Sequence, residues 1–418
     1  MTCFRFIHCS DLHIDSPFKG LGSVQPQLAE RLRGSTFQAF HNIVDLAVRE
    51  KVDAVVIAGD VYDGGDKSLQ AQLKFRRGLI ELGDAGIPSF IVHGNHDPLD
   101  SRFSKLVWPE QATVFSGKNV EGHAIRKNGT VVATVYGISY PTREVKENLA
   151  LQFPGAAKEG FAIGVLHTNV GHNPDHDDYA PCSVEDLVSR KMDYWALGHI
   201  HTHKILREHD PAIVYPGNTQ ARHKNEAGRK GCCLVTLHAD SPPEIRFIPT
   251  DTVRFVSDSL RLDGTQSIDD VLQSILIQCD GLLSQSEGCD LLIHLSLTGR
   301  TEAHQELRQT GNIETLSEEI QSRYDGQTPA VWVNLTLNTQ GTYDVENLRQ
   351  GNDFVADLLA LYDEADNETG LDELKEVLKP LLENWKGGKY LDAVSSQDLR
   401  GLLLEARNLT LDQLVEGE

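Results

Sequence analysis

Five short polar motifs in the first half of the chain combine the residue types that bind metal ions. In chain order they are Asp11-Leu12-His13, Gly59-Asp60, Gly94-Asn95-His96-Asp97, His167 and His199-Ile200-His201. Carboxylate, imidazole and amide ligands without a thiolate suit Mn²⁺ or Fe²⁺ best, and Mg²⁺ or Zn²⁺ less well. Two such ions side by side can hold the attacking and leaving oxygens of a displacement at phosphorus. The motifs therefore predict a two-metal phosphoesterase site, and we expect Asp60 to be the carboxylate that bridges the ions.

The spacing within the first and last motifs indicates which side chains share an ion. Asp11 and His13 are separated by one residue, and so are His199 and His201. On an extended backbone, residues two apart project to the same side. Each pair can therefore chelate an ion.

Each motif follows an apolar run that predicts a short strand. These runs cover residues 5–9, 54–58, 87–92, 161–166 and 193–197. In sheet-based enzymes, polar side chains gather beyond the carboxyl ends of the strands. Glycines at positions 59, 94 and 198 fit such a place, because a residue without Cβ lets the backbone turn sharply beside a crowded site.

The wider pattern predicts three domains. Helices are expected over 28–50 and 68–82, and further strands over 131–136, 212–215 and 232–237. This mixture predicts two packed sheets with helices outside them over residues 1–250. Residues 251–343 alternate strand and helix, with clear strands at 291–297 and 331–337, which indicates a small α/β cap domain.

Residues 344–418 are helix-like throughout. Leu371, Leu374, Leu378 and Leu381 recur at steps of three and four residues. Such a stripe faces the core of its own domain more often than it docks a partner, and both interpretations stay open here.

The motifs resemble the signature motifs of the calcineurin-like metallophosphoesterases. The stretches that carry the resemblance are Ser10-Asp11-Leu12-His13, Gly59-Asp60-Val61-Tyr62-Asp63, Gly94-Asn95-His96-Asp97, Leu166-His167-Thr168-Asn169 and Gly198-His199-Ile200-His201. Within that superfamily the chain resembles the SbcD-type DNA repair exonucleases, and most of all their YhaO branch. This narrower resemblance rests on residues 11–17, on residues 215–223 and on Lys230-Gly231-Cys232, and it extends to about residue 250.

The resemblance implies a four-layer αββα sandwich and a role for each motif residue. The first of two divalent ions, Mn²⁺ in our interpretation, would be held by Asp11, His13, Asp60 and His201. The second would be held by Asp60, Asn95, His167 and His199. His96 would be the catalytic imidazole that protonates the leaving oxygen, and Asp97 would orient its ring. The part played by Asp63 is left open, because related archaeal and eukaryotic nucleases have a histidine there.

The function implied is that of a DNA exonuclease or endonuclease in DNA repair, in which a hydroxide bridging the two ions attacks the phosphodiester. Proteins of this type join an SMC-like coiled-coil ATPase through C-terminal helices, and a homodimer is also compatible with the sequence. A small-molecule phosphatase or a (cyclic) nucleotide phosphodiesterase would use the same ions and is the alternative. A non-enzymatic scaffold is disfavoured, because every expected ligand is present.

Charge is distributed unevenly along the 418 residues. Residues 1–250 carry 27 basic and 29 acidic side chains, whereas residues 251–418 carry 12 and 32. The acidity therefore belongs to the C-terminal part, which makes it a poor candidate for phosphate contacts. Near the motifs, Arg222, His223 and Lys224 are the candidates for substrate binding, in a basic cluster that also contains Arg229 and Lys230.

Three remaining features place the chain more broadly. A loop with His172, Asp175, His176, Asp177 and Asp178 is expected at the rim of the site. The seven cysteines lack metal-type spacing and are expected to be reduced core thiols. No stretch approaches the roughly 20 apolar residues of a membrane span, and the sequence opens on a strand-like run, so we expect a cytoplasmic protein without membrane contact.

Overall fold

The computed structural model describes residues 3–16, 26–64, 68–101, 106–155, 159–171, 179–384 and 395–414. Contacts divide the chain into two compact units. The first contains Met1–Val256, Ser286–Leu292 and Gly326–Val331, and the second contains Ser257–Gln285, Ile293–Asp325 and Trp332–Glu418. Each unit is described separately below.

The first unit contains two six-stranded sheets. One has the order β12-β11-β1-β2-β3-β4, with β1 (Cys3–Cys9), β2 (Ala54–Ala58), β3 (Ser89–Val92), β4 (Ala112–Val114), β11 (Gly231–His238) and β12 (Glu244–Pro249). The other has the order β5-β6-β7-β8-β10-β9, with β5 (Glu121–Lys127), β6 (Thr130–Gly137), β7 (Phe161–His167), β8 (Tyr194–Gly198), β9 (Lys204–Arg207) and β10 (Ala212–Tyr215). The central strands β1 to β3, and likewise β7, β8 and β10, run parallel.

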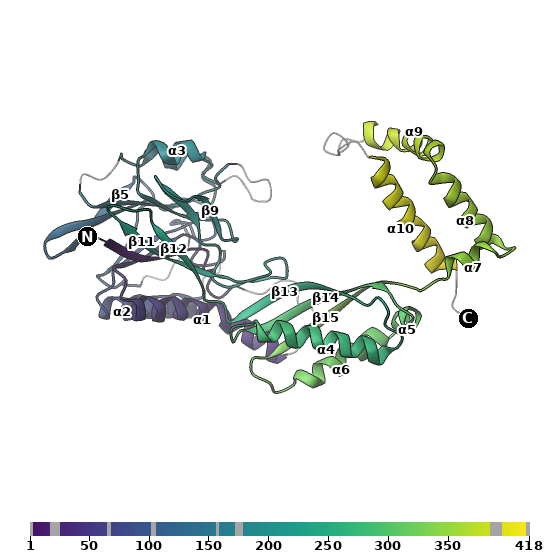
Figure 1. Ribbon diagram of the computed structural model, residues 1–418. Coiled ribbons are helices and arrows are strands. Elements are labelled where there is room, and N and C mark those ends of the chain that lie inside the picture. Colours follow the sequence, from purple (N-terminus) through teal and green to yellow (C-terminus); the bar gives the residue numbers. More distant parts are fainter. Residues whose placement is uncertain are drawn as a thin grey trace. The chain divides into compact units, whose positions relative to one another are not determined.

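Helices cover the outer face of each sheet (Figure 1). Helices α1 (Pro26–Glu50) and α2 (Leu69–Asp84) pack on the first sheet, where Phe40 and Phe75 belong to the same buried cluster as Ile57. The second sheet is covered by α3 (Val184–Ser189) and by a short 3₁₀ helix at Leu149–Gln152. A third buried cluster lies between the sheets. The predicted four-layer αββα sandwich is therefore confirmed.

Strand β1 shows how the sequence builds these layers. Successive side chains of a strand point to opposite faces, so Phe4 and Phe6 enter the cluster between the sheets while Ile7 and Cys9 face the helices. Both faces are buried, and that is why the central strands are continuous apolar runs. In the first unit the predicted strand bounds agree with the observed ones to within about two residues, whereas β4, β5, β9 and β12 were not predicted. β5, for example, is half exposed and lacks an apolar run.

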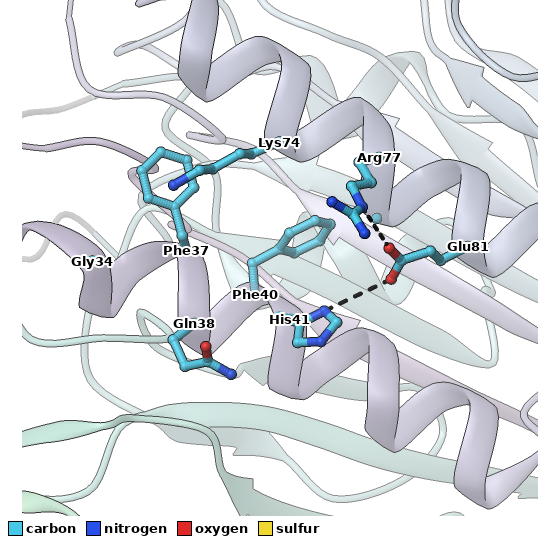
Figure 2. A pocket seen from close by; sticks show the side chains of 9 residues that line it. Gly34, Phe37, Gln38, Phe40, His41, Lys74, Arg77 and Glu81 are labelled. Atoms are coloured by element: carbon cyan, nitrogen blue, oxygen red, sulfur yellow. Dashed lines mark hydrogen bonds and ion pairs between the residues drawn. The ribbon is translucent and has the colours of Figure 1, made fainter.

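Helices α1 and α2 meet closely along one line. A Cβ at Gly78 would lie 2.5 Å from the Phe40 ring, so glycine allows the close approach. Beside this contact a groove of about 370 Å³ opens, where Lys74 lies 3.8 Å above the ring of Phe37 and Glu81 pairs with Arg77 (Figure 2). None of the residues lining the groove is a predicted site residue. The groove is therefore a feature of helix packing, separate from the motifs.

The second unit combines a sheet with two groups of helices. Its parts are β13 (Val253–Arg261), β14 (Asp290–Arg300) and β15 (Val331–Gln340), whose first residues belong to the first unit, and α4 (Ile268–Ser284), α5 (His304–Arg308) and α6 (Asn312–Tyr324). Helices α7 (Val345–Arg349), α8 (Phe354–Ala365), α9 (Glu368–Asn384) and α10 (Ser396–Leu414) follow. This order agrees with the predicted α/β cap and helical C-terminal region, although the domain boundaries stay a prediction.

The C-terminal leucines are divided between core and surface. Leu371 is buried and Leu374 and Leu378 are half-buried, whereas Phe354 and Val377 are exposed. The side chain of Leu381 lies outside the described residues. None of the helices in the described part of the chain is both long and apolar enough to cross a bilayer.

Candidate metal centre

All five motifs lie at the carboxyl ends of central strands. Asp11 follows β1, Asp60 follows β2 and Asn95 follows β3 of the first sheet. His167 is the last residue of β7, and His199 follows β8 of the second sheet. Both sheets therefore supply side chains to a single place at the edge of the sandwich, as the sequence predicted.

Asp60 lies in the middle of this group. Its Oδ2 atom is 3.9 Å from Nε2 of His13 and 3.4 Å from Nε2 of His167. Its Oδ1 atom accepts a hydrogen bond of 3.0 Å from the backbone N–H of His96. The carboxylate is 1 % exposed. A carboxylate between two imidazoles, with one oxygen facing both, has the geometry that a bridging ligand needs.

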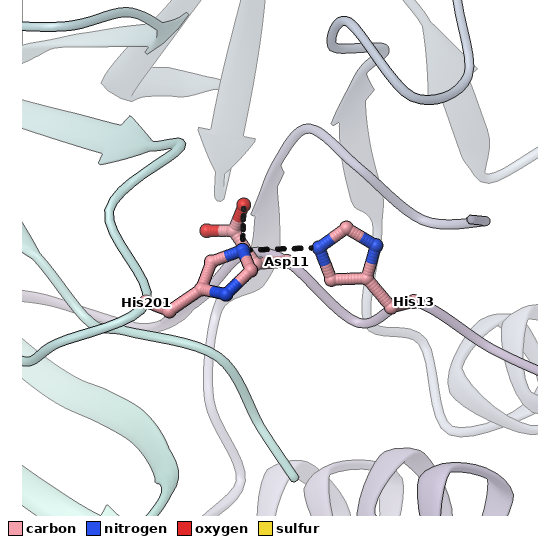
Figure 3. A group of neighbouring side chains, drawn as sticks. All are labelled: Asp11, His13 and His201. Atoms are coloured by element: carbon pink, nitrogen blue, oxygen red, sulfur yellow. Dashed lines mark hydrogen bonds and ion pairs between the residues drawn. The ribbon is translucent and has the colours of Figure 1, made fainter. Parts of the chain in front are cut away.

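On one side of Asp60, a carboxylate and two imidazoles converge (Figure 3). Nε2 of His13 and Nε2 of His201 are 3.2 Å apart, and Oδ1 of Asp11 lies 3.8 Å from Nε2 of His201. One ligand atom from each of the three residues lies within 4.8 Å of the other two. Three donor atoms around one point fit a single divalent ion.

On the other side, an imidazole and an amide face each other. Nε2 of His167 is 2.9 Å from Oδ1 of Asn95, and Nδ1 of His167 is 3.0 Å from the carbonyl oxygen of Ala58. The carbonyl can only accept, so it fixes the proton on Nδ1 and leaves Nε2 as the donor atom for a metal. Asp11, Asp60 and His167 also form a group whose ligand atoms lie within 4.8 Å of one another.

His199 is placed less directly than the other candidates. Its backbone N–H lies 3.1 Å and 3.2 Å from the two carboxylate oxygens of Asp11. Its ring centre is 5.3 Å from that of His167 and 5.7 Å from that of Tyr179. The three groups of close ligand atoms found among the described residues do not include it. Its assignment as a ligand stays a prediction.

The backbone of the motifs is not extended, so that part of the expectation is wrong. Asp11, His13, Asp60 and His199 have φ values of 51°, 42°, 52° and 105°. A left-handed conformation costs a residue with a side chain about 1 to 2 kcal/mol. Such strain concentrates at functional sites, where the surrounding structure enforces it. The side chains converge through tight left-handed turns and not through strand alternation.

Two glycines allow the strand ends to approach each other. A Cβ at Gly198 would lie 1.8 Å from the carbonyl oxygen of Ala58, which belongs to the other sheet. A Cβ at Gly94 would lie 2.3 Å from Oδ1 of Asp60. These contacts explain the glycines beside the motifs, because any side chain there would push the ligand groups apart.

The electrostatics of the group favour bound positive charge. Burial would lower the pKa of His167, but the Asp60 carboxylate outweighs burial and raises the pKa to about 9. Burial would raise the pKa of Asp60, but His167 and His96 hold it well below its ordinary value. Carboxylates that remain charged while buried attract cations. With imidazole, amide and carboxylate donors facing inward, the residues fit two divalent ions.

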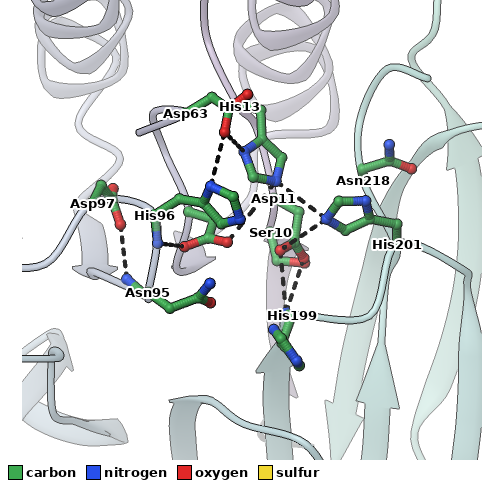
Figure 4. A network of polar contacts seen from close by, with 12 residues as sticks. Ser10, Asp11, His13, Asp63, Asn95, His96, Asp97, His199, His201 and Asn218 are labelled. Atoms are coloured by element: carbon green, nitrogen blue, oxygen red, sulfur yellow. Dashed lines mark hydrogen bonds and ion pairs between the residues drawn. The ribbon is translucent and has the colours of Figure 1, made fainter. Parts of the chain in front are cut away.

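The partner of His96 differs from the expected one. Asp97 was predicted to orient the ring, but its carboxylate accepts from the backbone of Val61 and Gly94 and lies 2.8 Å from Nδ1 of His93. Oδ1 of Asp63 lies 2.8 Å from Nδ1 of His96 instead (Figure 4). The reason is the turn at residues 94–97, because the Gly94 and Val61 amides occupy both oxygens of Asp97. Asp97 therefore shapes the loop, and Asp63 holds the ring.

Asp63 has two further partners. Its Oδ2 atom accepts from Ser16 at 2.6 Å and from the Arg222 guanidinium at 2.9 Å. Burial would raise its pKa, but the His96 hydrogen bond and the other partners hold it well below its ordinary value. Burial would lower the pKa of His96, and Asp63 raises it above its ordinary value. The sequence signal for Asp63 was its place three residues after Asp60, in a turn that directs both carboxylates inward.

The basic cluster is less available to phosphate than the sequence suggested. The Arg222 side chain is 12 % exposed and paired with Asp63, and Arg229 is paired with Glu287. Lys230 is buried. His223 lies 3.4 Å from a carboxylate, whereas Lys224 is exposed. The assignment of Arg222, His223 and Lys224 to substrate stays a prediction.

One predicted loop cannot be located, and one residue beside the site was not predicted. The rim loop of His172, Asp175, His176, Asp177 and Asp178 lies outside the described residues. Glu226 was missed: it lies within the basic cluster, in the loop after β10, and its carboxylate reaches the ring of His201. A buried glutamate in a basic loop gave no motif that the sequence alone could mark.

The fold and the site together define a class of protein. Residues 4–203 match the family described as calcineurin-like phosphoesterase. Over this region, just under half of the chain, the sequence is similar to the calcineurin-like phosphoesterases, and the two helix-flanked sheets with metal-type residues at their strand ends agree with that similarity. Residues 255–339 match a second family, the middle domain of metallophosphoesterase YhaO.

Individual relatives narrow the comparison. The metallophosphoesterase YhaO of Bacillus subtilis (strain 168) is 41 % identical over 56 % of this chain and 58 % of that protein. The DNA double-strand break repair proteins Mre11 of Sulfurisphaera tokodaii and Aeropyrum pernix are each 27 % identical, over 58 % and 57 % of this chain and 62 % and 59 % of those proteins. Each match spans less than two thirds of the relative's length. The similarity supports the YhaO branch, and the SbcD-type grouping stays a prediction.

Proposed function

We propose that this chain is a binuclear metal-dependent phosphodiesterase that hydrolyses DNA. The observation that carries the proposal is the place of Asp60, which lies between His13 and His167 with further ligand groups on both sides. Asp11, His13, Asp60 and His201 hold one divalent ion in this proposal, and Asp60, Asn95, His167 and His199 hold the other. Manganese is the proposed metal, because the donor set contains oxygen and imidazole groups and no thiolate.

The chain's own residues have distinct tasks in this reaction. The ions, when bound, activate the attacking water and neutralise the charge on the phosphate. His96 holds a proton for the leaving oxygen, and Asp63 keeps the ring in place through Nδ1, so that Nε2 is left to meet the substrate. The His96 side chain is 32 % exposed, whereas the candidate ligands around it are mostly buried. That exposure is what a group that meets an entering substrate needs.

DNA as substrate is supported by the relatives and by the charge distribution. Two relatives are described as DNA double-strand break repair proteins. Residues 1–250 are close to neutral before any ion binds, and two divalent ions would make the neighbourhood of the site positive. The strongly acidic part of the chain lies elsewhere in the sequence, after residue 250.

His96→Ala tests the catalytic assignment. We expect hydrolysis of linear DNA with Mn²⁺ to fall by roughly 10²- to 10⁴-fold, because the leaving alkoxide loses its proton donor. Metal content, measured on the same samples, should be unchanged. Loss of metal in this variant would make His96 a ligand and the assignment wrong.

End-labelled linear DNA separates the proposed substrate from the alternative. Mn²⁺-dependent release of mononucleotides or short oligomers by the wild type, but not by His96→Ala, is expected. A salt-sensitive gel shift with duplex DNA should accompany it, because phosphate contacts release counterions. Hydrolysis of cyclic or small nucleotides with intact DNA would instead favour the small-molecule phosphodiesterase.

The C-terminal helices are proposed to dock an SMC-like coiled-coil ATPase. Several large apolar side chains on these helices are exposed, among them Phe354, Leu361 and Val377 at 67 %, 62 % and 71 %. A chain ending at residue 343 should keep its phosphoesterase activity and lose capture of the ATPase. Unchanged capture would rule this docking out. A homodimer and a cytoplasmic location stay predictions.

A further inference from the structure

The side of His201 that faces away from the other ligands is held by a buried carboxylate. Oε1 of Glu226 lies 2.6 Å from Nδ1 of His201, while Nε2 of the same ring faces His13 and Asp11. A carboxylate accepts hydrogen bonds, so the proton of the imidazole is fixed on Nδ1. Nε2 therefore carries the lone pair that a metal ion needs.

Glu226 is itself fixed from two further directions. Its Oε2 atom accepts from the Asn218 side chain at 3.0 Å and from the backbone N–H of Arg222 at 2.7 Å. The residue is 7 % exposed, and Asn218 is fully buried. Burial would raise the pKa of Glu226, but the hydrogen bond to His201 and the other partners lower it to about 2. Three hydrogen-bond donors offset the cost of burying this carboxylate, because an unpaired buried charge would be strongly destabilising.

The backbone of His201 is held as well as its ring. The ammonium group of Lys230, which is 6 % exposed, donates to the carbonyl oxygen of His201 at 3.0 Å. The backbone N–H of Asn218 donates to the same carbonyl at 3.3 Å. The segment from Asn218 to Lys230 therefore encloses His201 on two sides (Figure 4 shows Asn218 beside the ring).

Two other candidate ligands, His167 and His13, have no carboxylate within hydrogen-bond distance of the ring nitrogen that faces away from the centre. His167 uses a neutral carbonyl group, that of Ala58, at its remote nitrogen. Nδ1 of His13 is buried without a hydrogen-bond partner, and the nearest carboxylate oxygen, from Asp63, is 4.0 Å away. A carboxylate behind a ligating imidazole fixes its orientation and raises its basicity, and losing it weakens metal binding about 10- to 100-fold.

We propose that Glu226 is a positioning residue for His201, and that its hydrogen bond makes the ion site of Asp11, His13 and His201 the tighter of the two. This inference rests on the proposed two-metal function. It gives the loop after β10 a role in holding a metal ligand, although none of the five motifs lies in that loop. Glu226 touches no substrate in this scheme and acts only through the imidazole.

Isothermal titration calorimetry of the metal-free protein with Mn²⁺ tests the proposal. Wild type should bind two ions with different affinities. In Glu226→Gln we expect the tighter site to weaken about 10- to 100-fold while the other affinity stays unchanged. Turnover should recover when Mn²⁺ is raised, because the residue sets ion affinity and not the chemical step. The exposed Glu208→Gln is the matched control and should behave as wild type.

The outcomes separate this inference from the proposed function. Two ions in wild type and unchanged affinities in Glu226→Gln would overturn the positioning role alone. A wild type that binds no divalent ion would overturn the proposed function. If Glu226→Gln does not fold, Asn218→Ala removes one donor that holds the carboxylate and should weaken the same site in the same direction. An equal weakening of both sites in that variant would also contradict the proposal.

Discussion

At the scale of single residues, the contacts of Asp63 show how the ring of His96 is held. The Asp63 carboxylate joins the ring of His96 to Ser16 and to Arg222. Nδ1 of His96 is thereby occupied, which leaves Nε2 as the nitrogen able to face a leaving oxygen. The resemblance to nucleases with a histidine at this position left the role open, and the geometry supports a positioning role.

Asp63→Asn should therefore lower kcat with metal content unchanged. We expect a loss of about tenfold or more, smaller than that of His96→Ala, because the imidazole remains but its orientation is weakened. KM should change little, since the ring position affects the chemical step. Steady-state kinetics with a DNA substrate, together with metal analysis, measure these quantities.

Asp45→Asn, an exposed change on α1, is the control for the loss of one negative charge. Loss of metal in Asp63→Asn would mean that Asp63 acts through His13, whose Nδ1 lies 4.0 Å away. Unchanged kcat would contradict the positioning role.

The candidate ligand residues were within reach of sequence analysis because their types are rare in combination. Asn95 and His96 after an apolar run, and His199 and His201 around one residue, marked the site. The hydrogen-bond partners were not within reach. Asp97 and Asp63 are both aspartates beside motif residues, and only the path of the backbone decides which of them meets His96.

At the scale of elements, the strand ends of the two sheets must approach closely for the centre to form. Gly198, at the end of β8, faces the carbonyl oxygen of Ala58 at the end of β2, and leaves no space for a side chain. Backbone cannot move aside as a flexible side chain can. The junction between the sheets is therefore the least tolerant place beside the site.

Gly198→Ala should disrupt this junction. The new Cβ would lie 1.8 Å from a backbone oxygen, so we expect a loss of about 3 kcal/mol or more in the free energy of unfolding. Bound metal should fall with it, because β8 delivers His199 and His201. Urea unfolding and metal analysis measure the two effects.

Gly281→Ala gives the opposite expectation from the same substitution. Gly281 lies within α4, and a Cβ there meets no atom within 4 Å. It should stabilise the chain by about 0.5 to 1 kcal/mol, because alanine favours helix over glycine. A Gly198→Ala chain as stable as wild type would show that the strand ends can separate without harm.

Central strands and edge strands differ in how well the sequence predicts them. β2 and β8 are buried on every residue, so their apolar runs are unmistakable. β5 is partly exposed along its length and β9 is mostly exposed, and their side chains carry no periodic signal strong enough to separate strand from loop. Left-handed turns after β1 and β2 were also missed, because nothing in the residue types of Asp11 and Asp60 requires a positive φ.

At the scale of the whole molecule, a buried histidine provides a polar link in the interior between the two sheets. His8, fully buried on β1, lies 3.0 Å from the Tyr194 hydroxyl, and its Nε2 is 3.1 Å from the carbonyl oxygen of Leu197. Both ring nitrogens are satisfied when the imidazole is neutral. Burial lowers the pKa of His8 to about 3, so the folded chain resists protonation that the unfolded chain accepts below about 6.5.

This shift predicts how stability depends on acidity. Because the folded pKa is depressed, the contribution of His8 is fully present above about pH 6.5 and is lost as pH falls toward 3. The slope from this group is at most about 1.4 kcal/mol per pH unit. In His8→Gln, the free energy of unfolding should fall less steeply between pH 6.5 and 4.5 than in wild type.

His41→Gln is the control for this measurement, because the His41 side chain is half exposed on α1. It should follow the wild-type pH dependence. A His8→Gln curve parallel to wild type would show that His8 is not the group responsible.

The origin of the candidate ligands has one more consequence. Three of the five motifs come from the first sheet and two from the second. Cations bound among them would link the two sheets. Any ligand that binds only the folded form adds to the free energy of unfolding, by about 2.7 kcal/mol for each ion present at a hundred times its dissociation constant. If the proposed ions bind, we therefore expect the stability of the first unit to rise with the concentration of divalent cations.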